Sequence, residues 1–189
     1  MSYFMITNGN TKVKAMIFDL PAVTTCKEEC KGCYALKAQK RFPNVRKKRE
    51  ANYDYSNSQY FVSDMCGDIG INKKHEYFRI HSSGDFYCQD YVDKWVTIIK
   101  DFPRVKFYAY TKRIEDFNFS ELLSLPNMNL INSNTPNGVN YGDQTYCDDL
   151  VKNHGYIQCP CSSTNTVKCQ VDCFVCSTKG QDKICFLKH

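Results

Sequence analysis

The sequence predicts an α/β protein that carries a cysteine-rich tail, and three observations lead to this prediction. Short apolar runs of strand length alternate with longer segments of helical periodicity as far as residue 158, which is the pattern of parallel βα units. The 189 residues suffice to bury the core of one domain. Six of the 12 cysteines lie in the last 31 residues, where periodicity fades. We therefore expect a main unit over 1–158 and a tail over 159–189 within the same globule.

The apolar runs predict five strands, and their number sets the size of the sheet. Five βα units in about 160 residues make a partial (β/α) barrel or an open sheet, because a complete eight-unit barrel needs roughly 250 residues. We take a partial barrel of about five βα units as the expected architecture. The expected strands cover 13–19, 77–81, 105–110, 128–131 and 155–158.

Helical segments separate these strands, and several of them carry start or stop signals. Pro43 suits a first helical turn, and Asn118 or Ser120 can cap a short helix that follows. Gly155 stands just beyond another helix, where a left-handed residue commonly ends one. The expected helices cover 34–41, a segment that opens at Pro43, 89–101, 119–125 and 143–153.

Composition excludes several classes of protein. Hydrophobic residues make up 42% and aromatic residues 14% of the chain, so the chain has enough apolar mass to fold. No run of 18 apolar residues is present, and we expect no membrane partner. No secretory signal is visible, so we expect a cytoplasmic location. In a reducing compartment cysteines persist as thiols, which favours metal binding over a disulfide framework.

A basic stretch runs from Lys27 to Arg49, with nine Lys or Arg residues and two acidic residues. Its densest part spans Arg46 to Arg49, within the helix that opens at Pro43. A solvated helix face explains such a run, and an electrostatic footprint for nucleic acid is the alternative. The net charge of +5 permits an anionic partner, so nucleic acid remains a candidate partner.

Three cysteines gather directly after the first expected strand. Cys26, Cys30 and Cys33 follow the spacing Cys-x3-Cys-x2-Cys and precede the helix at 34–41. Three thiolates in one loop can hold a metal centre, but structural zinc normally takes four protein ligands. A cubane 4Fe–4S cluster held by three thiolates leaves one iron open for a small molecule. Because ligands at the carboxyl ends of parallel strands meet at one mouth, we expect an open cluster there.

Two further loops at strand ends carry residues suited to a charged ligand. Gly84 permits close approach of the backbone to a ligand, and the Asp85 carboxylate can accept hydrogen bonds from an ammonium group. Arg113 could bind a carboxylate through its planar fork. Both segments have ordinary explanations, because Ser-Ser-Gly-Asp is a common turn and a basic pair often ends a solvated strand. The expected binding residues are Ser82, Ser83, Gly84 and Asp85 after the second strand, and Lys112 and Arg113 after the third.

The first cysteine group resembles the signature of the radical S-adenosylmethionine (SAM) superfamily. In that superfamily the open iron binds the amino and carboxylate groups of SAM, and an electron from the cluster cleaves SAM to methionine and a 5′-deoxyadenosyl radical. The cofactor supplies the chemistry, while the protein supplies orientation and exclusion of water. Many members have an aromatic residue just before the third cysteine, whereas this chain has Gly32 there and Tyr34 just after it. We include Tyr34 among the expected cofactor-binding residues.

The segments around the strand ends resemble the phage gene product 88 family, a small radical-SAM-like group. The resemblance runs in matching order from about Phe18 to His189 and includes the segments Arg41 to Val45 and Phe78 to Phe86. It places Ser83-Gly84-Asp85 where larger radical SAM enzymes have a Gly-Gly-Glu motif that binds the SAM amino group. It also implies a phage-encoded protein in the cytoplasm of a bacterial host.

Cys169, Cys173 and Cys176 in the tail repeat the cysteine spacing of the first loop, and cysteines just upstream can provide a fourth metal ligand. A fully ligated centre suits a structural or electron-relay role. We expect a second 4Fe–4S cluster, with zinc as the alternative, because four cysteines bind zinc at similar spacings. The preferred ligands are Cys159, Cys169, Cys173 and Cys176, with Cys161 as the alternative. The cysteines that stand alone in the sequence are expected to be buried, unreactive thiols, namely Cys66, Cys88, Cys147 and Cys185.

Together these features predict an iron–sulfur protein, which we expect to be a radical SAM enzyme acting on a substrate that the sequence does not identify. We assign no catalytic side chain. Such an enzyme needs an electron donor such as a flavodoxin or a ferredoxin. The alternative is a non-catalytic zinc or iron–sulfur module that binds nucleic acid or senses redox state.

Overall fold

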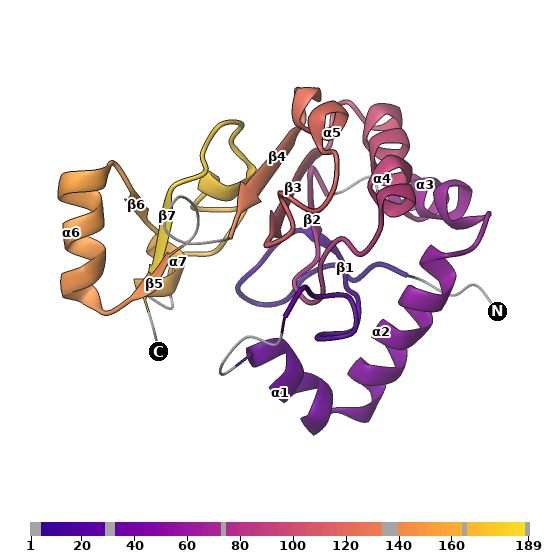
Figure 1. The fold of residues 1–189 in the computed structure, drawn as a ribbon, viewed down its shortest axis with the longest axis horizontal. Coiled ribbons are helices and arrows are strands. Elements are labelled where there is room, and N and C mark those ends of the chain that lie inside the picture. The colour runs from indigo at the N-terminus through magenta and orange to yellow at the C-terminus, as the bar shows by residue number, and fades with distance from the viewer. Residues whose placement is uncertain (1–4, 29–32, 73–74, 134–139, 164–165, 188–189) are drawn as a thin grey trace.

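A four-stranded parallel sheet lies at the centre of the computed structural model, which describes residues 5–28, 33–72, 75–133, 140–163 and 166–187 (Figure 1). Neighbouring strands follow one another in the order of the sequence. Four of the five predicted strands form this sheet, which confirms the parallel pairing expected of them. The strands are β1 (Met16–Phe18), β2 (Tyr77–Ile80), β3 (Lys106–Thr111) and β4 (Met128–Asn132).

Helices connect these strands, namely α1 (Tyr34–Arg41), α2 (Pro43–Ser56), α3 (Phe61–Ile71), α4 (Gln89–Asp101) and α5 (Ser120–Ser124). Figure 1 shows α2, α3 and α4 on one side of the main sheet and a smaller sheet on the other side. The bounds of α1 and α4 match the prediction, and α2 opens at Pro43 as expected. None of the helices in the described ranges is both long and apolar enough to cross a membrane.

The core between the sheet and the helices is aromatic. Trp95 of α4 is fully buried. Its ring centroid lies 5.5 Å from that of Phe78 and 5.9 Å from those of Phe18 and Phe61. These rings come from α4, β2, β1 and α3. Burial of the apolar face of α4 therefore packs two helices against the first two strands of the main sheet.

Helix α3 is absent from the sequence prediction. Its buried side chains Phe61, Met65 and Ile69 recur every fourth residue, which places them on one helical face. Gly67 and Gly70 lie in the same segment, and glycine disfavours a helix. Packing against α4 therefore overrides a weak local preference.

Strand β3 contributes to two separate cores. Phe107 and Ala109 pack in the core beneath the helices. Tyr108 and Tyr110 pack instead against cysteines of the tail. Because successive side chains of a strand point to opposite faces, the main sheet separates a helix-covered face from a face covered by the tail.

The small sheet combines strands from both expected units. It has the order β5 (Asn140–Gly142), β7 (Ile184–Leu187), β6 (Ile157–Gln158), and its pairs are parallel. Strand β6 is the end of the fifth predicted strand, and it pairs with β7 and not with the main sheet. Strands β5 and β6 precede the boundary expected after residue 158, whereas β7 follows it. Neither β5 nor β7 was predicted.

Short helical elements complete this lobe, namely α6 (Gln144–His154), α7 (Pro160–Ser163) and the 3-10 helix η1 (Val175–Ser177). The ends of α6 follow the predicted signals. The Asp143 carboxylate accepts a hydrogen bond from the Tyr146 amide at 2.9 Å, and Gly155 adopts a left-handed φ of 69°. Both features satisfy backbone groups that a helix end leaves unpaired.

Candidate functional site

The loops that follow β1, β2 and β3 meet at one edge of the main sheet, where the expected cofactor-binding residues lie. The Leu20 amide donates to the Ser83 carbonyl at 3.0 Å, which joins the first two loops. The Lys112 amide donates to the Asp85 carboxylate at 2.9 Å, which joins the second and third. The fold therefore brings the sequence-predicted residues together at the carboxyl ends of parallel strands, as expected.

Asp85 is the central connection of this edge. Its side chain is only 5% exposed. One carboxylate oxygen accepts from the Thr111 hydroxyl at 2.7 Å and from the Phe86 amide at 2.8 Å, and the other accepts from the Lys112 amide. Burial raises the pKa of Asp85 to about 6, against the lowering effect of these hydrogen bonds. Both oxygens are thus engaged within the protein.

Gly84 is required by packing of the chain against itself. Its φ is +84°, and a Cβ atom there would lie 2.6 Å from the Leu20 Cβ and 2.6 Å from the Thr25 hydroxyl oxygen. The Thr25 hydroxyl also accepts a hydrogen bond from the Asp85 amide at 3.2 Å. The turn after β2 therefore lies directly against the loop that leads to Cys26.

Asp19 is a site residue that the sequence analysis missed. One of its oxygens accepts from the Ser82 amide at 2.7 Å and from the Ser83 amide at 3.1 Å. Its other oxygen lies 3.6 Å from the Arg49 guanidinium. Its position as the polar residue immediately after an apolar strand was the available signal, because such residues reach the edge of a parallel sheet.

Tyr34 begins α1, and its hydroxyl donates a hydrogen bond to the carbonyl of Ser82. The ring is 62% exposed. Tyr34 therefore connects the end of the cysteine loop to the Ser82 turn while most of its surface remains accessible to solvent. Its place beside the expected cofactor-binding loop agrees with its sequence assignment, although contact with a cofactor stays a prediction.

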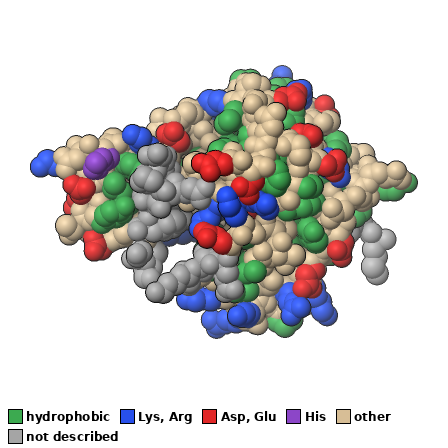
Figure 2. Space-filling model, viewed as in Figure 1, with side chains coloured by type: hydrophobic (Ala, Val, Ile, Leu, Met, Phe, Trp, Pro, Cys, Tyr) green, Lys and Arg blue, Asp and Glu red, His purple; other side chains and the backbone are tan. Residues whose placement is uncertain are grey.

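Lys112 and Arg113 pair with acidic side chains around the cysteine loop. The Lys112 ammonium lies 3.0 Å from a Glu28 oxygen, and the Arg113 guanidinium lies 2.8 Å from Asp116. Lys27 lies 2.8 Å from another oxygen of Asp116. Figure 2 shows basic and acidic side chains side by side near the middle of this face. These pairs fasten the cysteine loop to the residues that follow β3.

The N-terminal cysteines lie at this polar edge. Cys26 and Cys33 are half-buried, and Cys30 lies outside the described residues. The Cys33 sulfur is at the N-terminus of α1, where it accepts a hydrogen bond from the Leu36 amide at 3.4 Å. A helix N-terminus favours negative charge, so this position suits a thiolate ligand.

The tail cysteines gather on the opposite side of the sheet from the helices. Cys159, Cys161 and Cys176 are buried with Tyr108 and Ile131, and Cys169 and Cys173 pack against the same group. All five predicted tail ligands therefore lie in one cluster, which we call the tail cysteine group.

Burial dominates the acid–base behaviour of three thiols of the tail cysteine group. It raises the pKa values of Cys159 and Cys161 and raises the pKa of Cys176 to about 12. Such thiols stay protonated at neutral pH unless a cation displaces the proton. Within the described ranges, no set of three or more His, Cys, Asp or Glu side chains has the arrangement of a metal-ion site. The donor chemistry fits a thiophilic metal, and occupancy stays a prediction.

Two cysteines expected to be isolated thiols form a disulfide instead. Cys147 of α6 and Cys185 of β7 are bonded, with their Cα atoms 5.8 Å apart. The prediction was wrong because residues 38 positions apart in sequence become neighbours only through the unpredicted strand β7. Cys66 fits its prediction better, since burial raises the pKa of its half-buried thiol to about 11. Cys88 is also half-buried.

Part of the basic stretch serves the fold. Arg49 is 6% exposed and donates to the Ala35 carbonyl at 2.9 Å. The Lys48 ammonium donates to the Ile6 carbonyl at 3.3 Å, and Arg46 pairs with Glu50 at 2.7 Å. These contacts favour the structural explanation of the run at 46–49.

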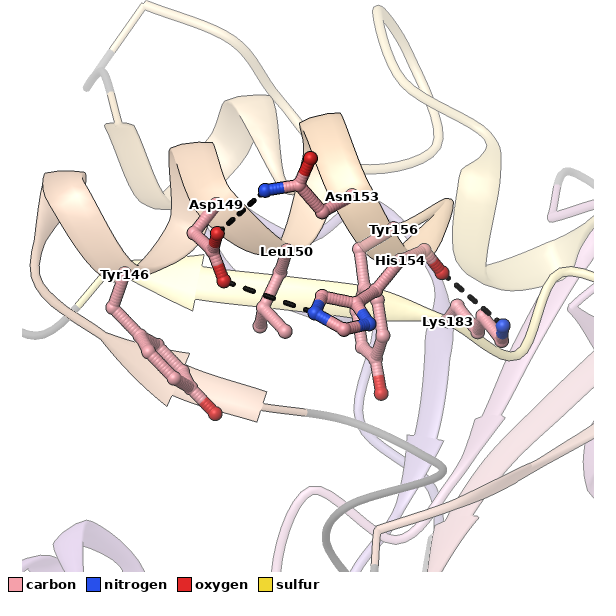
Figure 3. Close-up of a pocket in the computed structure, with 7 residues that line it drawn as sticks. All are labelled: Tyr146, Asp149, Leu150, Asn153, His154, Tyr156 and Lys183. Carbon is pink, nitrogen blue, oxygen red and sulfur yellow. Dashed lines mark hydrogen bonds and ion pairs between the residues drawn. The ribbon is translucent and has the colours of Figure 1, made fainter.

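A separate hollow of about 580 Å³ lies beside α6 (Figure 3). Its polar groups largely pair with one another. Asn153 donates to Asp149 at 2.7 Å, His154 lies 3.8 Å from Asp149, and Lys183 donates to the His154 carbonyl at 3.2 Å. We assign it no function. Its lining is formed by Tyr146, Asp149, Leu150, Asn153, His154, Tyr156 and Lys183.

Comparison with known proteins identifies the family. The family model described as Gene product 88 matches residues 5–158. The chain therefore belongs to the Gene product 88 family, and the resemblance predicted from the sequence is confirmed at this level. No solved structure matches the chain.

Two curated relatives are phage proteins. The Gene 88 protein of Mycobacterium phage D29 is 29% identical over 112 residues, which cover 52% of this chain and 47% of the relative. The Gene 88 protein of Mycobacterium phage L5 is 41% identical over 51 residues, which cover 27% of this chain and 21% of the relative. The chain thus spans about half or less of the length of these relatives. Their names support a phage protein and specify no activity.

Proposed function

We propose that this protein is an iron–sulfur enzyme of the radical SAM type, with a partial-barrel fold. Cys26, Cys30 and Cys33 would hold a 4Fe–4S cluster with one open iron, and SAM would bind beside it. When bound, these groups supply reductive cleavage of SAM and a carbon radical that abstracts hydrogen from a substrate. The proposal does not identify the substrate. A flavodoxin or ferredoxin would deliver the electron.

The observation that carries the proposal is the convergence of the three loops through Asp85. The cysteine loop, the turn after β2 and the residues after β3 are joined by hydrogen bonds of 2.7 to 3.2 Å to and from this residue. A cluster in the first loop would therefore face the second and third loops. Asp85 acts in this proposal as a positioning residue, because its oxygens are already engaged.

The groups of the edge that solvent still reaches are then the ones available to a ligand. Ser82 is half-buried and Tyr34 is exposed. Lys112 and Arg113 would reach a ligand carboxylate by exchanging their present carboxylate partners, Glu28 and Asp116, for it. Such an exchange conserves charge pairing, and the partly exposed side chains of Lys112 and Arg113 keep it partly screened by solvent.

The tail cysteine group would bind a second metal centre. Four of its five thiols suffice for a 4Fe–4S cluster or for zinc. Its buried position suits a closed centre that stabilises the small lobe or relays electrons. We favour iron–sulfur because the tail repeats the spacing of the first cysteine loop.

The second candidate function is a non-catalytic metal module that binds nucleic acid or senses redox state. The engagement of both Asp85 oxygens favours it, because the residue expected to receive the SAM amino group is used by the fold. The exposed Lys and Arg side chains of the Lys27 to Arg49 stretch would supply the nucleic-acid contacts.

Anaerobic reconstitution with iron and sulfide tests the proposal. The reduced protein with SAM is expected to release 5′-deoxyadenosine, measured by chromatography, and Cys30→Ala should abolish the release. Cys66→Ala is the matched control, because Cys66 lies outside both cysteine groups and contacts Asp101. If the loaded wild-type protein releases no 5′-deoxyadenosine, the enzyme proposal is rejected and the metal module stands.

Metal content tests the tail separately. A Cys169→Ala, Cys173→Ala double variant should lose one metal centre and keep the other, as determined from iron, sulfide and zinc content per chain. Equal metal content in this variant and in Cys66→Ala would reject a metal centre in the tail.

A further inference from the structure

Arg79 is a half-buried cation on the tail-facing side of β2. Its Nε donates to the carbonyl of His81 at 3.2 Å, and its guanidinium lies 5.3 Å from the centroid of the Tyr110 ring. Arginine stays charged in proteins at any physiological pH. The strand therefore presents a permanent positive charge to the face that the tail covers.

This charge has no acidic partner at contact distance among the described residues. Asp19 interacts with it electrostatically, but the Asp19 oxygens already serve Ser82, Ser83 and Arg49. Lys112 and Arg113, by contrast, each have a carboxylate within 3.0 Å. A partly buried charge without a counterion is costly, so the position of Arg79 calls for an anion nearby.

The tail cysteine group is a candidate for that anion. The guanidinium of Arg79 lies over the ring of Tyr110, and Tyr110 packs against the buried cluster that contains Cys176. Arg79 also interacts with Cys176 electrostatically. A metal centre with four thiolate ligands carries net negative charge, and it would form on the side of Tyr110 that faces away from the helices.

We propose that Arg79 is the counterion of the thiolate–metal centre of the tail, a positioning residue that stabilises its negative charge. This inference rests on the proposed metal centre and goes beyond it, because it assigns to a strand residue the control of that centre's affinity and reduction potential. Reduction adds one further negative charge to a cluster, so a neighbouring cation favours the reduced state.

The test uses the full chain with Cys26, Cys30 and Cys33 replaced by alanine, so that only the tail centre forms. In this background Arg79→Gln removes the charge and Arg79→Lys retains it. Lys106→Gln is the matched control. It removes one positive charge from β3, where the ammonium lies 5.9 Å from the Tyr77 ring centroid. Circular dichroism checks that each variant is folded.

Cobalt(II) is the first probe, because its thiolate absorption reports binding without iron–sulfur assembly. We expect Arg79→Gln to bind Co²⁺ about tenfold more weakly than the parent, by the loss of roughly one close charge interaction. Arg79→Lys and Lys106→Gln should stay within about twofold of the parent. Equal affinity in Arg79→Gln and Lys106→Gln would overturn the inference.

The iron-loaded protein gives the second readout. At a fixed ambient potential, the reduced-to-oxidised ratio in Arg79→Gln should fall about tenfold, which corresponds to about 59 mV for a one-electron couple. Arg79→Lys should restore most of the ratio. An unchanged potential in Arg79→Gln rejects the counterion role while the metal centre stands, whereas a tail that binds neither cobalt nor iron rejects both.

Discussion

The cysteines of the first loop lie at a polar edge of the main sheet, whereas those of the tail lie in an apolar core. Cys26 and Cys33 are half-buried and surrounded by ion pairs such as that between Lys112 and Glu28. Cys161 and Cys176 are buried beside aromatic rings. The two groups share one sequence spacing, so spacing alone does not define their roles. The surroundings of each group define its role, because the polar edge suits ligand exchange and the apolar core suits a closed centre.

The largest expected effect sharpens this contrast. If the tail binds the proposed metal, Cys176→Ser should destabilise the metal-loaded fold by about 5 kcal/mol, because metal binding and folding of the tail would then be coupled. This corresponds to a fall in Tm of roughly 10–20 °C. Cys26→Ser should cost only about 1 kcal/mol, since hydrogen bonds and ion pairs already hold its loop. Calorimetry measures both, and equal losses would remove the distinction between the two groups.

The disulfide gives the next largest effect, within the small lobe. Replacing Cys147 and Cys185 together by serine should lower the free energy of unfolding by about 4 kcal/mol, given a separation of 38 residues. Urea titration measures the loss. Cys66→Ser, outside the disulfide, should change stability by less than about 1 kcal/mol. A double variant as stable as this control would mean that the bridge does not form in solution.

Substitution of two glycines with similar backbone angles, one at the edge and one in the tail, compares the two regions. Gly84 and Gly180 have φ values of +84° and +81°, but only Gly84 has atoms where a Cβ would lie. Gly84→Ala should cost about 3 kcal/mol, from backbone strain and a clash with Leu20 and Thr25. Gly180→Ala should cost about 1 kcal/mol, from strain alone. Denaturant midpoints report both, and matching values would show that the Gly84 turn can move away from the cysteine loop.

The smallest expected effect is a pH dependence confined to the edge. The pKa of Asp85 is about 6 in the folded protein against an ordinary value of 3.8, so the folded state binds this proton more tightly. The resulting stabilisation is complete below pH 3.8 and is lost as the pH rises to 6. Relative to Asp85→Asn, the wild type should lose about 2 to 3 kcal/mol between pH 4 and pH 7. Urea titrations at both pH values test this, and a constant difference would contradict the buried placement of Asp85.

Local sequence patterns predicted the main sheet well because its strands and helices have strong periodicity. The apolar spacing of α4 around Trp95 and the proline that opens α2 are signals that neighbouring residues carry. The same patterns missed β5 and β7, with three and four residues. Such short strands are stable only through distant pairing. The disulfide was missed for the same reason, since Cys185 reaches Cys147 through β7.

The candidate site also has features that the sequence predicted and features that it did not. The residues of the three loops could be located from strand ends, and the structure brings them together. What the sequence could not reveal is how they are used. Asp85 meets Thr111 and Lys112 across 26 and 27 positions, and Asp19 meets Ser82 across 63. These contacts depend on the register of three strands, which no local pattern encodes.

The side chains of β3 alternate between the two faces of the main sheet, and this alternation has a consequence for expression of the protein. Tyr108 and Tyr110 are covered only as long as the small lobe stays docked, because Phe107 and Ala109 occupy the helix-covered face. If the tail holds the proposed metal, loss of that metal would uncover a row of phenol rings along a sheet. Chains expressed in iron- and zinc-poor medium should accordingly self-associate through this surface while their helices remain intact.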